Sequence, residues 1–328
     1  MIVVTGGAGF IGSNLLAGIE ARGEGPVVVC DELGSEDKWR NIAKREIEDV
    51  VPPAELRHWL DSNASRVHMI FHLGAISSTT ARDADAIIAN NFRLTSDLWD
   101  WCAHRGIRLV YASSAAVYGD GGAGFDDALD PAALSALRPL NPYGWSKLLF
   151  DRRAARLAAH RGQHPEQWAG LRFFNVYGPN EYHKGGQRSV VPQFWEQIRD
   201  SGRARLFRSH HADYADGGQL RDFVHVDDCV AVMLWLYDNP SVSGLFNLGT
   251  GAARSFADLA GALFAAMDRP AEIDFVDTPP QIRQQYQYFT EARMERLRAA
   301  GYDRPFISLE DGVRDYVQTY LEANDPYR

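Results

Sequence analysis

Short apolar runs alternate with segments of helical spacing along the first half of the chain. The apolar runs cover residues 1–5, 26–30, 67–75 and 107–114, and the helical segments between them include 10–23 and 84–106. A further helix is expected from about Tyr143 to His160, followed by a strand over 168–176. Continuous apolar strands separated by helices are typical of a parallel sheet covered on both faces. The pattern therefore predicts an α/β fold with a doubly wound parallel sheet.

The regular alternation of predicted strands and helices ends after residue 176. Residues 177–221 are expected to be rich in loops, because they hold Pro179, Pro192 and several glycines. Beyond them the pattern predicts a strand leading into a helix over 221–238, a strand and turn over 244–251, and helices near 255–267 and 308–323. We expect one compact unit with a smaller C-terminal α/β lobe.

The composition excludes several classes of protein. The 328 residues are 45% apolar and 23% charged, with a formal net charge of −9 and no long basic run. Nucleic-acid binding is therefore disfavoured as the main role. Cys30, Cys102 and Cys229 are too sparse for a disulfide framework. Without a signal-peptide pattern or a run of ~20 apolar residues, we expect a cytoplasmic protein with no membrane partner.

The stretch TGGAGFIG places Gly6, Gly9 and Gly12 between the first strand and the first helix. Glycines there permit a tight turn and a close approach to a pyrophosphate, which the helix N-terminus also attracts. A tight turn alone would also use glycines, but Asp31 follows the second strand, where an acid meets the adenosine ribose. We therefore predict a Rossmann-type dinucleotide site.

The choice between NADP and NAD stays open. Asp31 and Glu32 favour a free ribose 2′-hydroxyl, whereas Lys38 and Arg40 could neutralise a 2′-phosphate. Both cations could equally be surface charges.

Ser114, Tyr143 and Lys147 form a candidate catalytic group. Ser114 ends a predicted strand, and Tyr143 and Lys147 are four residues apart, so they share one face of the expected helix. A lysine ammonium beside a phenol is expected to lower the tyrosine pKa from ~10 and to make it an acid–base group near neutral pH. A YxxxK pair alone is usually solvent-exposed, but here it accompanies the glycine turn and the serine.

The stretches TGGAGFIG, SSAAVYG, YGWSK, FFNVYGP and RDFVHVDD occur in the order typical of extended short-chain dehydrogenases/reductases, the NAD-dependent epimerase/dehydratase family. The resemblance covers nearly the whole chain and implies a nucleotide-sugar substrate. HLGAISSTT, NVYGPNEYHKGG, FNLGTGAARSF and LRAAGYDRPF further resemble the ADP-glyceromanno-heptose 6-epimerase family. On this basis we assign 1–172 and about 222–249 to the NADP-binding Rossmann domain, and about 173–221 and 250–328 to the substrate-binding lobe.

The narrower resemblance implies a complete reaction. Such an enzyme inverts C-6″ of ADP-D-glycero-D-manno-heptose through a 6-keto sugar, using tightly bound NADP, in lipopolysaccharide core biosynthesis. It implies that Lys184 is a second acid–base group beside Tyr143, because the hydroxyl oxygen at C-6″ occupies two places in the two epimers. Lys184 could instead bind a substrate phosphate or hydroxyl, pair with Glu181, or lie free on the surface. Close family members are homo-oligomers, often pentamers.

The resemblance also implies two sets of contact residues. Those expected at the cofactor are Gly6, Gly9, Phe10, Ile11, Gly12, Asp31, Glu32, Lys38, Leu73, Gly74, Ala75, Ile76, Ser77, Asn90, Lys147, Val176 and Lys184. Those expected at the substrate are Ser114, Asn175, Gly186, Gln193, Phe207, Arg208, Ser209, His210, Arg221 and Tyr286. Arg221 suits a diphosphate because its guanidinium is a planar fork, although it could pair with Asp222 or Asp228. Tyr286 could instead be a core aromatic residue.

Some positions depart from the family pattern. Gly186 and Gln193 stand where a serine and a histidine are expected, Leu73 replaces an acid, and residues 210–219 form an insert. No clear counterpart of an expected lysine occurs around residues 50–55. These departures concern the substrate pocket and leave the reaction type intact.

Rival functions fit the sequence less well. A 4,6-dehydratase would need acidic residues after Ser114, where this chain has SSAAVYG. A UDP-hexose 4-epimerase, the main alternative, would share the serine, tyrosine and lysine without needing Lys184. A redox sensor or scaffold on the same fold would be favoured by a broken catalytic group, and this one is intact. We assign no metal to His210, His211 and Asp213, since neighbouring histidines in a loop are usually only polar.

Overall fold

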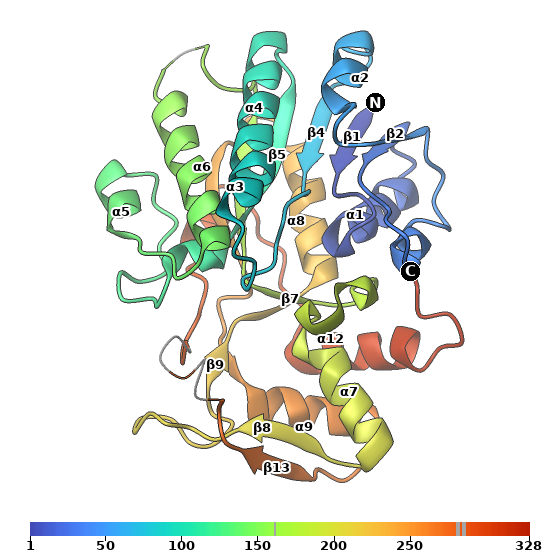
Figure 1. The fold of residues 1–328 in the computed structure, drawn as a ribbon, viewed down its shortest axis with the longest axis vertical. Coiled ribbons are helices and arrows are strands. Elements are labelled where there is room, and N and C mark those ends of the chain that lie inside the picture. Colours follow the sequence, from blue (N-terminus) through green and yellow to red (C-terminus); the bar gives the residue numbers. More distant parts are fainter. Residues whose placement is uncertain (161, 280–282, 284–286) are drawn as a thin grey trace.

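The computed structural model describes residues 1–160, 162–279, 283 and 287–328. Its centre is a sheet of seven parallel strands in the order β11-β6-β5-β4-β1-β2-β3. Figure 1 shows β5, β4, β1 and β2 of this sheet side by side. These strands are β1 (Ile2–Thr5), β2 (Val27–Cys30), β3 (Asp49–Val51), β4 (Met69–His72), β5 (Arg108–Ser114), β6 (Trp168–Phe173) and β11 (Gly244–Leu248). The predicted doubly wound parallel sheet is confirmed.

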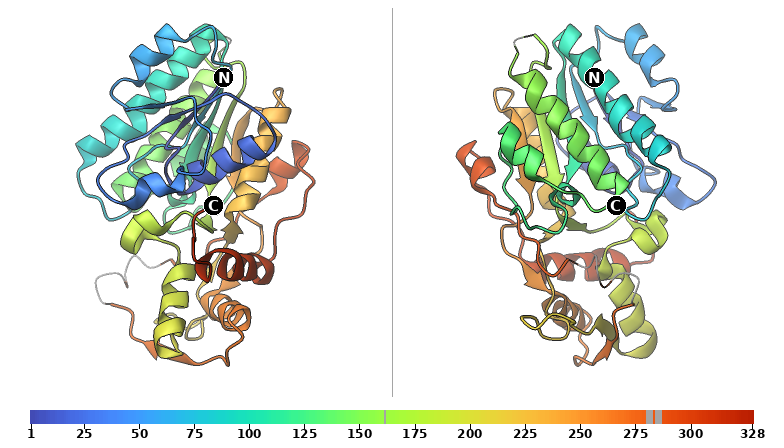
Figure 2. Two further views of the ribbon diagram at one scale, coloured as in Figure 1. Left: turned by 90° about the vertical axis from the view of Figure 1, so that its right-hand side faces the viewer. Right: turned by 60° about the vertical axis from the view of Figure 1, so that its left-hand side comes forward.

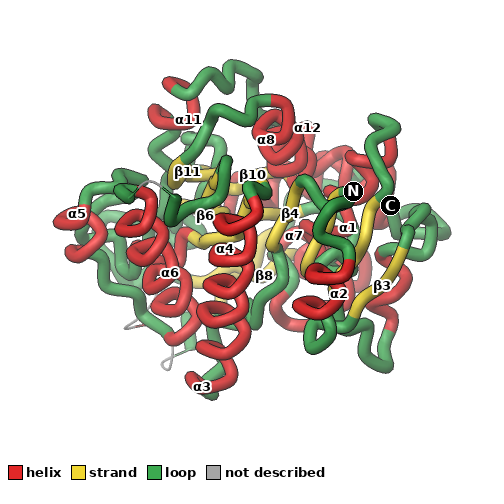
Figure 3. The backbone as a smooth tube through the Cα atoms, turned by 90° about the horizontal axis from the view of Figure 1, so that it is seen from above, coloured by secondary structure: helices red, strands yellow, loops and turns green. Residues whose placement is uncertain are grey.

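Helices cover both faces of this sheet, with α4 and α6 on one side and α8 on the other (Figure 3). The helical elements up to α6 are α1 (Phe10–Ala21), η1 (Asp37–Asn41), α2 (Leu56–Ser62), α3 (Ala84–Ile87), η2 (Ile88–Arg93), α4 (Leu94–Arg105), η3 (Ala115–Tyr118), α5 (Pro131–Ala136) and α6 (Pro142–Ala158). The later ones are η4 (Tyr182–Gln187), α7 (Val190–Ser201), α8 (Val226–Asp238), α9 (Phe256–Ala266), α11 (Glu295–Ala299), α12 (Leu309–Asp315) and η5 (Tyr316–Leu321).

A second, smaller layer lies below the sheet in Figure 1 and has a hydrophobic core of its own. Helices α7 and α9 pack there against β8 (Ala204–Phe207), which pairs in parallel with β13 (Ile273–Val276), and α12 packs on α9. Short pairs complete the fold: β7 (Asn175–Tyr177) with β10 (Phe223–His225), and β9 (Leu220–Arg221) with β12 (Arg254–Ser255).

Two expectations about elements need correction. Residues 177–221 hold loops as expected, but they also hold η4, α7 and β8, which the pattern did not predict. Pro192 is the third residue of α7, where the helix does not use the backbone N–H that proline lacks. The single strand expected over 168–176 is two strands in different sheets, β6 and β7, separated by Phe174.

All three cysteines are buried and unpaired thiols. Burial raises the pKa of Cys30 to about 12 and also raises the pKa of Cys102 and of Cys229. Within the described residues, no helix combines the length and apolar character needed to cross a bilayer.

Candidate active site

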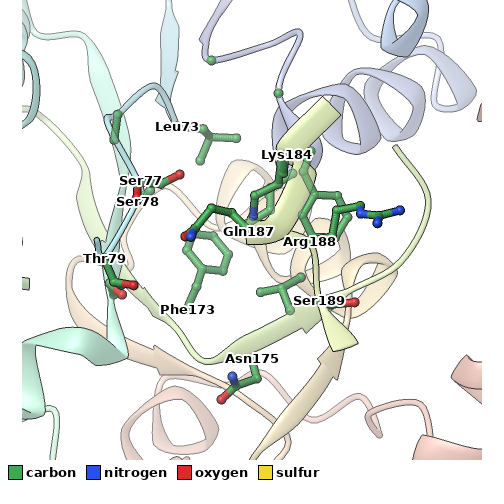
Figure 4. Close-up of a pocket in the computed structure, with 18 of the residues that line it drawn as sticks. Leu73, Ser77, Ser78, Thr79, Phe173, Asn175, Lys184, Gln187, Arg188 and Ser189 are labelled. Carbon is green, nitrogen blue, oxygen red and sulfur yellow. The ribbon is translucent and has the colours of Figure 1, made fainter. Parts of the chain in front are cut away.

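A cavity of about 720 Å³ opens at the carboxyl ends of the central strands, facing the smaller layer. The sheet order reverses between β1 and β4, and the loops that follow these two strands both line the cavity. A crevice at such a switch point is the usual ligand site of an open α/β sheet. Lys184 and Gln187 extend from η4 toward the wall that carries Ser77, Ser78 and Thr79 (Figure 4).

In the glycine turn, segments of backbone approach one another too closely for any side chain to fit. Gly6 has φ +68°, and a Cβ on it would lie 2.6 Å from the backbone nitrogen of Gly74. A Cβ on Gly12 would lie 2.1 Å from the carbonyl oxygen of Gly6. No side chain caps the first turn of α1, which begins after Gly9, so its backbone N–H groups can bind an anion. These features fit the pyrophosphate of a dinucleotide.

Asp31 directly follows β2, and its side chain contacts the glycine turn. Its Oδ2 accepts a hydrogen bond from the backbone N–H of Ala8 at 2.9 Å. Its Oδ1 accepts one from Lys38 Nζ at 2.6 Å, and both side chains line the cavity. An acid fixed in this way suits a ribose hydroxyl, and the adjacent ammonium suits a phosphate.

Ser114, Tyr143 and Lys147 come together at the cavity, from the end of β5 and the first turns of α6. Lys147 Nζ donates a hydrogen bond to the carbonyl oxygen of Ala112 at 2.8 Å and lies 6.0 Å from the centre of the Tyr143 ring. Burial lowers the pKa of Lys147 to about 8, opposed by nearby Asp151.

The expected lowering of the Tyr143 pKa is not found. Burial raises the pKa of Tyr143 above its usual value, and a hydrogen bond with Ser114 only partly opposes this. Lys147 is itself desolvated, and its ammonium is directed at the carbonyl oxygen of Ala112.

Lys184 also faces the cavity, so the free-surface alternative does not describe it. Its Nζ lies 5.5 Å from the centre of the Phe10 ring. Burial lowers its pKa, and the charge of Glu181 opposes the shift. The carboxylate of Glu181 accepts hydrogen bonds from the N–H and hydroxyl of Ser189 and forms no ion pair within 4.0 Å with Lys184. The proposed structural pair is therefore not formed between these two described residues.

Most of the predicted cofactor residues line the cavity together. They are Gly6, Gly9, Phe10, Ile11, Gly12, Asp31, Lys38, Leu73, Gly74, Ala75, Ile76, Ser77, Lys147, Val176 and Lys184. Glu32 and Asn90 lie outside this lining, and the Asn90 amide donates to the carbonyl oxygen of Ala86 at 2.9 Å.

The predicted substrate residues are more dispersed. Ser114 and Asn175 line the cavity. Gly186 is exposed in η4, and Gln193 donates to the carbonyl oxygens of Arg188 and Ser189 at 2.9 and 3.2 Å. Outside the cavity lining lie Phe207, Arg208, Ser209 and His210, at the end of β8 and just after it.

Arg221 lies just beyond the cavity wall, and Tyr286 lies outside the described residues. The guanidinium of Arg221 is 5.7 Å from the ring centre of Phe256, which lines the cavity. It also donates to the carbonyl oxygen of Gln287 at 2.5 Å.

Several lining residues were not selected from the sequence. His183 has its Nδ1 3.0 Å from Asn41 Nδ2, and burial lowers its pKa to about 4, so it is neutral near pH 7. Ser78 and Thr79 directly follow the predicted run 73–77, which was the available signal. Gln187, Arg188, Ser189, Val190, Val191 and Phe256 also line the cavity without a comparable signal. No group of three or more residues able to hold a metal occurs among the described residues.

The chain is similar to known proteins along its whole length. The profile of the NAD dependent epimerase/dehydratase family matches residues 2–249. The ADP-L-glycero-D-manno-heptose-6-epimerase of Nitratidesulfovibrio vulgaris is 49% identical over 329 residues, and that of Fusobacterium nucleatum is 44% identical over 335, each match covering 100% of both chains.

Two solved structures extend the comparison. The Helicobacter pylori ADP-L-glycero-D-manno-heptose-6-epimerase has a TM-score of 0.77 and 27% identity, covering 97% of this chain and 95% of that one. The Thermus thermophilus UDP-glucose 4-epimerase complex with NAD has a TM-score of 0.76 and 26% identity, covering 98% and 99%.

Proposed function

The chain belongs to the NAD-dependent epimerase/dehydratase family, and we propose that it converts ADP-D-glycero-D-manno-heptose to ADP-L-glycero-D-manno-heptose by inverting C-6″. One observation carries the proposal. Two acid–base candidates from different elements, Tyr143 on α6 and Lys184 on η4, face one cavity beside a dinucleotide-type glycine turn. Full-length relatives at 44–49% identity bear the name of this activity.

The glycine turn, Asp31 and Lys38 would hold a nicotinamide dinucleotide. When bound, that cofactor supplies a reversible hydride acceptor for the carbon at C-6″. We favour NADP, because Lys38 Nζ lies 2.6 Å from the Asp31 carboxylate and is placed to meet a 2′-phosphate. Relatives in the family bind NAD, so NAD is the alternative.

Tyr143 would exchange the proton of the C-6″ hydroxyl in one epimer. Ser114 would hold the same oxygen, since it already hydrogen-bonds the tyrosine. Lys147 would stabilise the phenolate as it forms, from its position one turn along α6.

Lys184 would serve the other epimer. The 6-keto sugar is flat at C-6″, and rotation about its exocyclic bond presents either face while moving the oxygen. One tyrosine cannot follow the oxygen to both positions, so a second proton-exchanging group is needed. Burial lowers the pKa of Lys184, which makes its neutral, basic form easier to reach.

The test is inversion of ADP-D-glycero-D-manno-heptose followed by NMR. We expect the wild type to form the L-glycero epimer, and Lys184→Ala and Tyr143→Phe each to lose about 100-fold or more, the size typical of a general acid or base. Tyr237→Phe and Arg57→Ala are matched controls, because Tyr237 bonds His68 and Arg57 bonds Asp61 on other surfaces. Near-wild-type activity of Lys184→Ala would leave Tyr143 working alone. No inversion by the wild type would refute the substrate.

A further inference from the structure

Residues 324–328, called the strap here, run from the smaller layer to the sheet domain. The preceding element η5 ends at Leu321 in the smaller layer. The end of the chain then lies beside the N-terminal helices, as the views in Figures 1 and 2 both show. The strap therefore connects the two layers beside α1.

The first anchors of the strap are on and just after η1. Lys44 Nζ lies 2.9 Å from the Asp325 carboxylate. The guanidinium of Arg40 lies 4.5 Å from the centre of the Tyr327 ring, within the range of a cation–π contact. The Tyr327 side chain is buried, with 9% exposure. These contacts hold the strap against η1 and the residues just after it.

The second anchors are on residues 178–187, called the Lys184 loop here. Tyr182 OH donates to the carbonyl oxygen of Pro326 at 2.9 Å, and the rings of Tyr182 and Tyr327 meet edge to face with centres 5.3 Å apart. The backbone N–H of Arg328 donates to Asn180 Oδ1 at 2.9 Å. Tyr182 is only two residues before Lys184, so the strap holds the loop close to the acid–base candidate.

Asn14 joins these anchors to the glycine turn. Its Oδ1 accepts a hydrogen bond from Arg328 Nη1 at 3.0 Å. Its amide donates at 2.9 Å to the carbonyl oxygens of Phe10 and Pro179, one on α1 and one in the Lys184 loop. Arg328 is also ion-paired with Asp227 on α8. One arginine thus ties α8, α1 and the Lys184 loop together.

We infer that Tyr327 and Arg328 are positioning residues that hold Lys184 at the cavity. Neither residue lines the cavity, so each would act through the Lys184 loop rather than by touching substrate. The inference rests on the proposed role of Lys184 as an acid–base group. A displacement of about 1 Å at a reacting group can cost up to ~10²-fold in rate, so loosening the loop should lower kcat with little change in substrate KM.

A double-mutant cycle tests the inference. We expect Arg328→Ala to lower kcat about 10- to 100-fold in the wild type, but to change it less than about twofold in the Lys184→Ala background, as coupled residues should. Tyr327→Leu is a second variant that keeps an apolar side chain against η1. Arg314→Ala is the control, because Arg314 pairs with Asp311 on the exposed side of α12.

Hydrogen exchange supplies a readout that does not depend on activity. In Arg328→Ala the amides of 178–187 should exchange faster, while those of β4 should not change. Equal losses in the two backgrounds, or unchanged exchange in the loop, would overturn the positioning role. If Lys184→Ala alone leaves the rate unchanged, the acid–base role of Lys184 fails, and the positioning role fails with it.

Discussion

At the scale of single residues, burial pushes the two acid–base candidates in different directions. It raises the pKa of Tyr143, so the phenol stays protonated, and it lowers the pKa of Lys184, so the amine loses its proton more readily than a free lysine. Two titratable groups whose pKa values are shifted in opposite directions by their surroundings are typical acid and base partners. Tyr143 thus rests as an acid, and the neutral, basic form of Lys184 is easier to reach than in a free lysine.

Lys147 should give the reaction an alkaline limit. In the proposed mechanism its ammonium form would stabilise the Tyr143 phenolate, and burial lowers its pKa to about 8, so kcat/KM should fall as the pH rises through 8. Asp151 favours the charged form, so Asp151→Asn should move this limb to lower pH. The measurement is the pH profile of inversion, with Asp100→Asn as a control, because Asp100 pairs with Arg153 on the surface of α4. A limb that stays in place in Asp151→Asn would contradict the assignment.

The sequence identified the chemistry of these residues but not their protonation. Spacing alone predicted that Tyr143 and Lys147 share a helix face and that Gly6, Gly9 and Gly12 form a turn. The direction of the Tyr143 shift depends on how deeply the ring is buried, and that burial comes from segments distant in the sequence.

At the scale of elements, His72 joins three parts of the sheet domain. Its Nδ1 lies 2.6 Å from Thr5 Oγ1 at the end of β1, and its Nε2 lies 2.8 Å from Thr95 Oγ1 on α4. Asn91 in η2 continues the link, since its amide donates to Ser146 Oγ on α6 at 3.1 Å. Since Thr95 Oγ1 also donates to the carbonyl oxygen of Asn91, hydrogen bonds run from the strand before the glycine turn to α6, the helix that carries Tyr143.

His72 should make the protein less stable in acid. Burial lowers its folded pKa to about 3, below the unfolded value of 6.5, so its contribution is present above pH 6.5 and is lost as the pH falls toward 3. In His72→Gln this titration is absent. We expect the loss of unfolding free energy between pH 7 and 4.5 to be about 2 kcal/mol larger in the wild type, measured by urea unfolding. An identical pH dependence in both proteins would refute this role.

Periodicity predicted the sheet elements better than the smaller layer. The buried strands β1, β2, β4 and β5 lie in continuous apolar runs, which can be recognised from the sequence alone. Helix α7 was missed because Pro192 was interpreted as a loop signal, although proline is tolerated in a first helical turn. Local propensity cannot decide such a case without the tertiary contacts.

At the scale of the whole molecule, the cavity lies between two hydrophobic cores. The glycine turn and β4 loop come from the larger core, whereas Val191 and Phe223 belong to the smaller one. A ligand that bridges both should stabilise the molecule as a unit. The division of the chain into a Rossmann domain over 1–172 and about 222–249 and a substrate-binding lobe over about 173–221 and 250–328 stays a prediction.

Cofactor preference should appear in the unfolding of the whole protein. A ligand at 100 times its Kd stabilises the native state by about 2.7 kcal/mol, so at equal concentrations the tighter cofactor gives the larger rise in Tm. We expect NADP+ to exceed NAD+ in the wild type, and Lys38→Ala to reverse that order by removing the cation beside Asp31. Arg66→Ala, whose arginine pairs with Glu48, is the control. A larger rise with NAD+ in the wild type would favour NAD.

The three buried thiols have a practical consequence for spectroscopy. A thiolate is the nucleophile that attacks thiol-reactive dyes and spin labels. Burial raises the pKa of Cys30, Cys102 and Cys229 and also shields each sulfur. We therefore expect labelling reagents to react little with the three natural cysteines of the native protein. One cysteine introduced at exposed Glu322, just ahead of the strap, would carry a single probe without prior removal of any natural residue.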